Sequence, residues 1–157
     1  MNMKNRILNS ITCFAMLFMA QAAEAQCPNN NYQYGTSNAP STVGVLTTFS
    51  TCMYGGEYRL VNNMQAGSQY SLETCGDFSF DTQLTIYDAS TGAFIAYNDD
   101  FCGVQSKVTF TSNGNPIRAV IDRYYCSNQS SCMTLKMTRL SGGAPAVDPC
   151  NSITALS

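Results

Sequence analysis

Acidic and amide side chains gather between Cys75 and Cys102, and these residue types are well suited to bind a metal ion. This stretch contains two segments that alternate apolar and polar residues, 83–88 and 93–98, joined by the turn-forming residues 89–92. Such a pattern predicts a β-hairpin. One acid precedes the first segment, whereas an amide and two acids close the second, so we expect them to meet at one end of the hairpin. These residues are Asp81, Asn98, Asp99 and Asp100.

Oxygen ligands of this kind suit Ca²⁺, which takes about six to eight of them. The cluster therefore predicts a calcium site, in which Asp77 could replace one of the four residues. Asp88 is excluded because it ends the first strand segment, about 20 Å from Asp81 at roughly 3.3 Å per residue. A second interpretation stays open, since Asp and Asn also favour turns, where their side chains bond nearby backbone amides.

The residue types of this chain argue against catalysis. The sequence contains no His, which excludes the usual Ser-His-Asp and Cys-His machinery. A zinc site is also not expected, because His and a Cys-x-x-Cys motif are both absent. Paired carboxylates hydrolyse glycosides in some enzymes. The sequence, however, contains no Trp that could stack against a sugar ring in a binding subsite. We expect a protein that is not an enzyme.

Tyrosines are the second set of candidate ligand-binding residues. Tyr87, Tyr97 and Tyr124 alternate with apolar residues in segments with strand patterns. Exposed together, they would form an aromatic platform for a polysaccharide or an extended protein. The alternative is ordinary packing, with the hydroxyl groups reaching the rim of the fold.

Residues 1–25 have the features of a secretory signal peptide. Lys4 and Arg6 precede an apolar run at 7–20, and residues 23–25 (AEA) fit the cleavage rule. The run is shorter than the roughly 20 residues that a membrane span needs. We therefore expect a secreted protein, extracellular or at the cell surface. Its net charge of −2 and lack of a basic stripe make nucleic acid and anionic lipid unexpected partners.

Seven of the eight cysteines follow the expected signal peptide, and export permits them to form disulfides. Their spacing favours a pair between Cys75 and Cys102, at the hairpin, and a pair between Cys126 and Cys132, around a short loop. The three others, which allow one more pair and leave one thiol over, are Cys27, Cys52 and Cys150. A lipid anchor at Cys27 is disfavoured by the residues in front of it.

Short strand-like segments with turn signals between them fill the rest of the chain. They are 43–50, 57–62, 69–74, 83–88, 93–98, 106–111, 117–125 and 133–139. This pattern predicts an all-β fold: a two-sheet antiparallel β-sandwich of jelly-roll or Greek-key type, with about eight strands and disulfide staples. We expect one domain at 43–140 after an extended leader at 26–42. Residues 141–157 have the composition of a linker and tail, with features of the start of a truncated next module.

Alternation also assigns the faces of the last two segments. In 117–125 the residues expected to face inward are Ile117, Ala119 and Ile121, and those expected to face outward are Arg118 and Asp122. In 133–139 the residues expected to face inward are Met133, Leu135 and Met137. In the hairpin, Thr85 and Tyr87 are expected on the face opposite Leu84 and Ile86.

Several motifs between residues 55 and 139 resemble those of one known family. They are 56–58 (GEY), 66–70 (AGSQY), 80–88 (FDTQLTIYD), 95–100 (IAYNDD) and 105–106 (QS). Together they are similar to the bacterial pre-peptidase C-terminal (PPC) domain family, in a cysteine-bearing secreted form. One departure is at 114–118 (GNPIR), where the family usually has Gly-x-Tyr-Tyr. The resemblance implies a β-sandwich accessory module of secreted enzymes and adhesins, some members of which bind calcium.

These observations lead to one functional expectation and one alternative. We expect a secreted non-catalytic module for surface binding or adhesion, with an extracellular polysaccharide or protein as ligand and with calcium as a stabilising ion. The alternative is a structural spacer, or a folding and secretion accessory domain, within a larger secreted hydrolase. Both leave room for other modules of a multidomain protein as partners.

Overall fold

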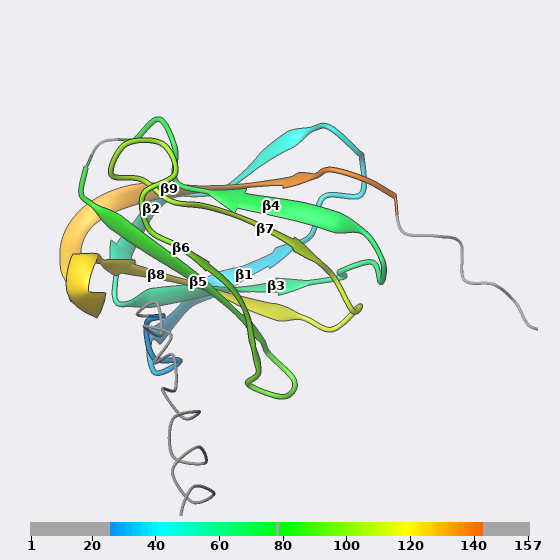
Figure 1. Ribbon diagram of the computed structural model, residues 1–157, viewed down its shortest axis with the longest axis horizontal. Helices are drawn as coiled ribbons and strands as arrows, with labels where there is room; N and C mark the ends of the chain where they lie inside the picture. Colours follow the sequence, from blue (N-terminus) through cyan, green and yellow to red (C-terminus); the bar gives the residue numbers. More distant parts are fainter. Residues whose placement is uncertain (1–25, 78, 143–157) are drawn as a thin grey trace, which may run out of the picture.

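Two facing β-sheets make up the computed structural model, which describes residues 26–77 and 79–142 (Figure 1). The expected signal peptide, most of the expected tail and Cys150 lie outside the described residues. The strands are β1 (Tyr32–Asn38), β2 (Leu46–Gly55), β3 (Glu57–Asn62), β4 (Gln69–Glu73), β5 (Thr82–Asp88), β6 (Phe94–Asn98), β7 (Lys107–Thr111), β8 (Ile117–Arg123) and β9 (Gln129–Arg139). A single 3₁₀ turn, η1 (Tyr124–Cys126), joins β8 to the segment before β9.

The order of the strands confirms the predicted fold class. One sheet has the order β1-β3-β8-β5-β6 and the other has the order β2-β9-β4-β7. All neighbouring strands run antiparallel except β1, which lies parallel to β3. The eight predicted strands correspond to β2–β9, whereas β1 forms within the stretch expected to be an extended leader. No described helix is long and apolar enough to cross a membrane.

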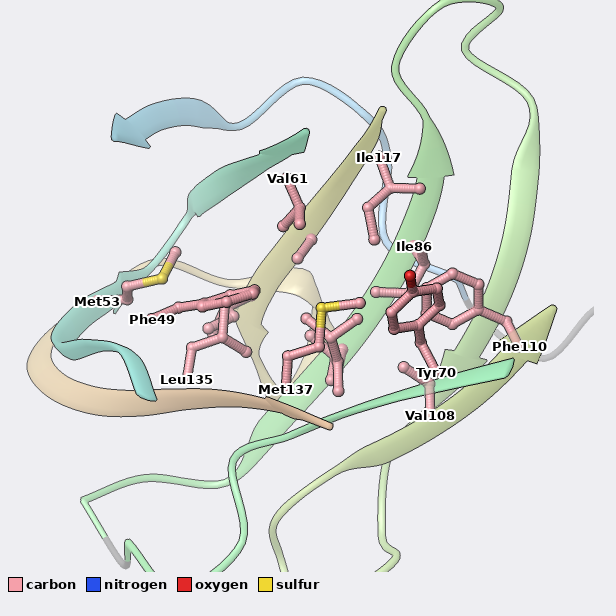
Figure 2. Packing of buried hydrophobic residues seen from close by; sticks show 14 of the residues in the cluster. Phe49, Met53, Val61, Tyr70, Ile86, Val108, Phe110, Ile117, Leu135 and Met137 are labelled. Carbon is pink, nitrogen blue, oxygen red and sulfur yellow. The ribbon is translucent and has the colours of Figure 1, made fainter. Parts of the chain in front are cut away.

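The core lies between the two sheets and includes the residues predicted to face inward on β8 and β9, together with Phe49, Met53 and Val61, which alternation did not assign (Figure 2). The inward residues predicted on β8 and β9 are each at most 1% exposed. Tyr70 on β4 stacks on Phe110 on β7, with ring centroids 6.2 Å apart. Burying one such large apolar side chain contributes about 1.5–3 kcal/mol, so this core provides most of the driving force for the fold.

The outer face of β5 and β8 is not exposed, which corrects the prediction for Asp122 and changes the setting of Thr85 and Tyr87. All three side chains are buried, because the segment before β1 crosses this face. The backbone N–H of Cys27 donates to Thr85 Oγ1 over 3.3 Å, and the hydroxyl of Tyr87 donates to the carbonyl of Cys27. Asn31 Nδ2 donates to Asp122 Oδ1 over 2.9 Å. The segment before β1 thus forms a third, partial layer.

Three disulfides connect the described chain: Cys27–Cys126, Cys52–Cys132 and Cys75–Cys102. The last of these is the pair predicted at the hairpin. The predicted pair of Cys126 with Cys132 is wrong, because β9 already begins at Gln129 and carries Cys132 alongside β2. Cys126 instead lies in η1, where it reaches the segment that crosses the outer face.

Candidate functional site

Three of the four predicted calcium ligands come together at one end of the β5–β6 hairpin. Asp81 immediately precedes β5, and Asp99 and Asp100 immediately follow β6. These two strands pair antiparallel with Leu84 opposite Asn98, so their register brings the three acids to the same end. One carboxylate oxygen of each lies within 4.8 Å of the others. We call this group the carboxylate cluster.

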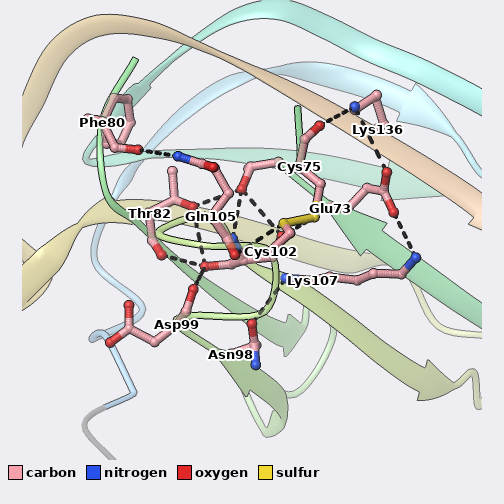
Figure 3. The surroundings of a disulfide bond; sticks show 12 residues. Glu73, Cys75, Phe80, Thr82, Asn98, Asp99, Cys102, Gln105, Lys107 and Lys136 are labelled. Carbon is pink, nitrogen blue, oxygen red and sulfur yellow. Dashed lines mark hydrogen bonds and ion pairs between the residues drawn. A yellow bond between two sulfur atoms is a disulfide. The ribbon is translucent and has the colours of Figure 1, made fainter. Parts of the chain in front are cut away.

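The loop that follows β6 is held in place by covalent and hydrogen bonds (Figure 3). The Cys75–Cys102 disulfide ties it to the end of β4. Ser106 Oγ lies 2.7 Å from the carbonyl of Asp99 and also contacts the carbonyl of Thr82. Asp99 and Asp100 are therefore on a loop that is fixed to the sandwich, beside Asp81 at the start of β5.

The bonding of the cluster leaves oxygens free for a cation. Asp81 Oδ1 and Asp99 Oδ1 are buried and have no hydrogen-bond partner among the described residues. The other oxygen of Asp99 accepts a bond from Gln83 Nε2 over 3.2 Å. Burial raises the pKa of Asp81 above its usual value, and the charges of Asp99 and Asp100 raise that pKa further. Buried polar atoms are usually paired, so this donor set fits a hard cation that accepts carboxylate oxygens.

The remaining predicted ligand, Asn98, already has a hydrogen-bond partner in the backbone. Its Oδ1 accepts the backbone N–H of Lys107 over 3.1 Å, and its side chain points away from that of Asp99 (Figure 3). The proposed substitute, Asp77, is also occupied, since its Oδ2 accepts two bonds of 2.9 Å from Thr134. For these two residues the turn-capping interpretation describes the bonding.

Asp88 lies at the other end of β5, away from the carboxylate cluster as expected. Its carboxylate accepts bonds from the backbone N–H groups of Ser90 and Thr91. It also accepts bonds of 2.9 and 2.8 Å from the side chains of Asn113 and Asn115. These two amide bonds are the main reason that the pKa of Asp88 lies far below its usual value. Asp88 therefore joins two turns rather than binding an ion.

The predicted tyrosine platform is not formed. Tyr87 is only 5% exposed, so it cannot contribute to an open face. Tyr97 is half-buried, and its hydroxyl accepts a bond from Gln83 Nε2 over 2.8 Å. Tyr124 is exposed, but it contacts Tyr125, with ring centroids 4.0 Å apart. The three tyrosines therefore have three different environments.

A different set of tyrosines lies on a shared surface. Tyr32 and Tyr34 on β1 and Tyr54 on β2 are exposed by 83%, 43% and 41%. They line two pockets between the β1 and β2 edges of the two sheets, and we call this surface the sheet-edge groove. The sequence interpretation missed β1 because the stretch lacks apolar alternation. The spacing of two between Tyr32 and Tyr34 was the available signal, since it places both on one face of a strand.

Comparison with known proteins identifies a family for most of this fold. Residues 46–142 match the family described as a domain of unknown function (DUF8695). The chain belongs to this family. The match spans β2–β9, so it includes the carboxylate cluster but not β1 or Cys27. No curated protein matches the chain.

One similar solved structure is the pre-peptidase C-terminal domain of a collagenase from Bacillus anthracis. It has a TM-score of 0.39 and 11% sequence identity, and the match covers 73% of this chain and 98% of that one. This is the family that the sequence motifs resemble, and the likeness is distant. A likeness at this level does not bear on the function of the present chain.

Proposed function

We propose that this chain is a non-catalytic extracellular β-sandwich module that attaches to a surface ligand and is stabilised by Ca²⁺ at Asp81, Asp99 and Asp100. The observation that supports the calcium site is the meeting of three carboxylates, two of which have buried oxygens without a hydrogen-bond partner in the described part of the chain. The ion would reduce the repulsion among these acids and link the start of β5 to the loop after β6. Water would complete its coordination shell.

Two features support a non-catalytic role outside the cell. Three disulfides join the described residues, and disulfides persist mainly in oxidising compartments. The sequence contains no His, and Asp81, Asp99 and Asp100 do not line the pockets of the sheet-edge groove.

The calcium part of this proposal predicts a calcium-dependent melting temperature. Binding to the folded state alone adds about 2.7 kcal/mol at an ion concentration of 100 times Kd. For a domain of this size, that corresponds to a rise of roughly 5–15 °C. We expect this rise for the wild type in CaCl₂ relative to EDTA, measured by differential scanning calorimetry.

Two variants make the measurement specific. Asp99→Asn should lose the calcium response, while its melting temperature in EDTA should be no lower than that of the wild type, because one repulsive charge is gone. Asp122→Asn is the matched control: this buried acid lies outside the cluster, so its calcium response should equal that of the wild type. Equal melting temperatures of the wild type in CaCl₂ and in EDTA would remove calcium from the proposal.

A structural spacer is the second candidate, and one observation favours it. The first and last described residues lie toward opposite ends of the sandwich (Figure 1), which suits a module placed in line between others. A spacer would hold its neighbours apart without a ligand of its own. Specific retention on an extracellular ligand, lost on substitution of exposed side chains, would argue against this candidate.

A further inference from the structure

We propose that the sheet-edge groove binds a neutral glycan chain. This inference rests on the proposed function as a ligand-attaching module, and it names the surface and the class of ligand. It does not depend on the calcium site, because the groove and the carboxylate cluster share no residue.

The groove is formed where one edge of each sheet meets the other. β1 is the edge strand of the five-stranded sheet, and β2 is an edge strand of the four-stranded sheet. One pocket of about 490 Å³ includes Tyr32, Tyr54 and the Gly55–Gly56 turn. A second pocket of about 450 Å³ includes Tyr34 and the segment 48–51 of β2. Because both pockets take residues from both strands, they follow one another along the same pair of edges.

Exposed tyrosine rings supply the apolar part of the surface. The C–H groups on one face of a pyranose ring form an apolar patch that packs against a flat aromatic ring. Tyrosine suits this role because it combines a large apolar area with a polar hydroxyl. Tyr32 and Tyr54 lie in the first pocket and Tyr34 lies in the second. Each pocket therefore offers at least one ring for stacking.

The other lining groups are mostly neutral hydrogen-bonding side chains. The first pocket includes Asn128, Gln129 and Ser130, and the second includes Ser50 and Thr51. Amides and hydroxyls can both donate and accept hydrogen bonds. They match the hydroxyl groups of a sugar, because each hydroxyl can also donate one hydrogen bond and accept others.

The two charged residues of the groove have opposite signs and are already engaged. Glu57 in the first pocket accepts the backbone N–H of Tyr54 over 2.8 Å. Arg59 in the second pocket donates to Ser37 Oγ over 2.7 Å, and its other nitrogens contact the carbonyls of Tyr34 and Thr36. The groove thus has no net charge, which favours a neutral ligand over an anionic polysaccharide.

The two glycines that line the first pocket lie close to the segment that carries its polar side chains. A Cβ added to Gly56 would lie 2.4 Å from Asn128 Oδ1, and one added to Gly55 would lie 3.0 Å from the backbone nitrogen of Gln129. This close packing fixes the segment that carries the polar side chains of the pocket. A preformed site loses little conformational freedom when a ligand binds.

The backbone of the two edges does not suit an incoming β-strand. Strand addition needs a regular row of free N–H and C=O groups. The register of β1 shifts between Gln33 and Thr36, and the carbonyls of Tyr34 and Thr36 already accept bonds from Arg59. The register of β2 shifts at three places along its pairing with β9. The groove is therefore better suited to recognition by side chains than to pairing with a peptide or a second copy.

Depletion isotherms on insoluble polysaccharides test the inference. The probes are the neutral polymers microcrystalline cellulose, chitin and xylan, together with anionic polygalacturonate. We expect the wild type to bind at least one neutral polymer, with Tyr32→Ala and Tyr54→Ala each weakening this binding about tenfold. Tyr32→Phe keeps the ring and should bind nearly as well as the wild type. Phe94→Ala is the control, because Phe94 is an exposed aromatic on β6, at the other edge of the same sheet.

Each contrary result has a separate meaning. The groove inference is overturned if the wild type binds no neutral polymer or binds only polygalacturonate. It is also overturned if the Tyr32→Ala and Tyr54→Ala variants bind as well as the wild type. Binding to collagen in place of every neutral polymer also overturns it, while leaving the proposed attachment function in place. Loss of the calcium response with intact polysaccharide binding would overturn only the calcium part of that function.

Discussion

Two aspartates on adjacent strands of one sheet have opposite pKa shifts, and the difference follows from their surroundings. The carboxylate of Asp88 accepts several hydrogen bonds, which lower its pKa. Asp122 lies beneath the segment before β1, where burial raises its pKa to about 6 despite bonds from Asn31 and the backbone of Gly56. One of its oxygens has no partner among the described residues. Above about pH 6, Asp122 is therefore charged in the folded protein, and its burial lowers the stability of the fold.

This cost predicts a pH-dependent gain in stability for Asp122→Asn. The pKa of Asp122 is raised from 3.8 to about 6 on folding, so its favourable contribution is complete below about pH 4 and is lost as the pH rises through 6. At pH 7.5 the Asn variant should be more stable than the wild type by about 1–3 kcal/mol. At pH 4 the two should be similar.

Urea denaturation in EDTA at both pH values measures this difference. The comparison isolates Asp122, because every other titrating group is common to the two proteins. Equal stabilities at pH 7.5 would show that the carboxylate of Asp122 is not strained by its burial.

For single residues, contacts between neighbours in the sequence could be predicted. The burial of a residue by a segment distant in the sequence could not. Asp81 and Asp99 meet because a hairpin register is local, and the alternation of 83–88 and 93–98 was enough to predict it. Spacing could not reveal the orientation of Asn98, whose side chain bonds the backbone N–H of Lys107. Tyr87 and Asp122 failed as exposed residues because a segment far away in the sequence covers them.

Among the structural elements, β1 and the segment before it depend most on covalent attachment. β1 pairs with only one neighbour, β3, and its side chains are mostly exposed. The Cys27–Cys126 disulfide fixes the start of this region to η1 across a sequence separation of 99 residues, against 27 for Cys75–Cys102. With Cys52–Cys132 intact, however, the loop that Cys27–Cys126 closes takes only 25 residues from Cys27 to Cys52 and 6 residues from Cys126 to Cys132. In the chain-entropy account, the two disulfides therefore restrict the unfolded state to a similar degree.

We therefore expect similar effects when either of these two disulfides is removed alone. Replacing Cys27 and Cys126 by Ser, or Cys75 and Cys102 by Ser, should lower the free energy of unfolding by about 3–4 kcal/mol. Guanidinium denaturation of both double variants in EDTA measures the two values. A difference of more than about 2 kcal/mol would mean that native contacts near one disulfide outweigh the entropy of the unfolded chain.

The alternation of apolar and polar residues predicted the strands that place residues in the core, β2–β9. It could not predict β1, which has no buried face. β2–β9 each place some residues in the core, so their apolar period is visible in the sequence. β1 lacks this period because it lies on an exposed edge. The cysteine pairing was only partly predictable for a related reason: Cys126 and Cys132 are close in sequence, but β9 carries Cys132 away along β2.

For the molecule as a whole, ion pairs contribute little to stability. Glu73 lies 2.9 Å from Lys107 and 3.9 Å from Lys136, and these are the ion pairs identified among the described residues. The three side chains are partly exposed to solvent, and ion pairs near the surface contribute about 0–1 kcal/mol each and are weakened by salt. The core and the disulfides provide the main stabilisation.

The stability of the molecule should therefore depend weakly on salt. Between 0.05 and 1 M NaCl, in EDTA, we expect the free energy of unfolding to fall by no more than about 1 kcal/mol. Urea denaturation at the two salt concentrations measures the change. A larger loss would show that charges outside these pairs hold the sandwich together.

The Cys27–Cys126 disulfide also determines how the molecule responds to mechanical load. Tension applied between Cys27 and Gly142 passes through this disulfide and then along the chain from Cys126, a path of about 55 Å at roughly 3.5 Å per residue. Without the bond, and with Cys52–Cys132 intact, the same two points are joined through Cys52 and Cys132 by a chain that extends to about 120 Å. β1–β8 lie between the two cysteines, so they are outside the loaded path. Under tension this module is a short tether in which β9 bears the force and the other strands do not.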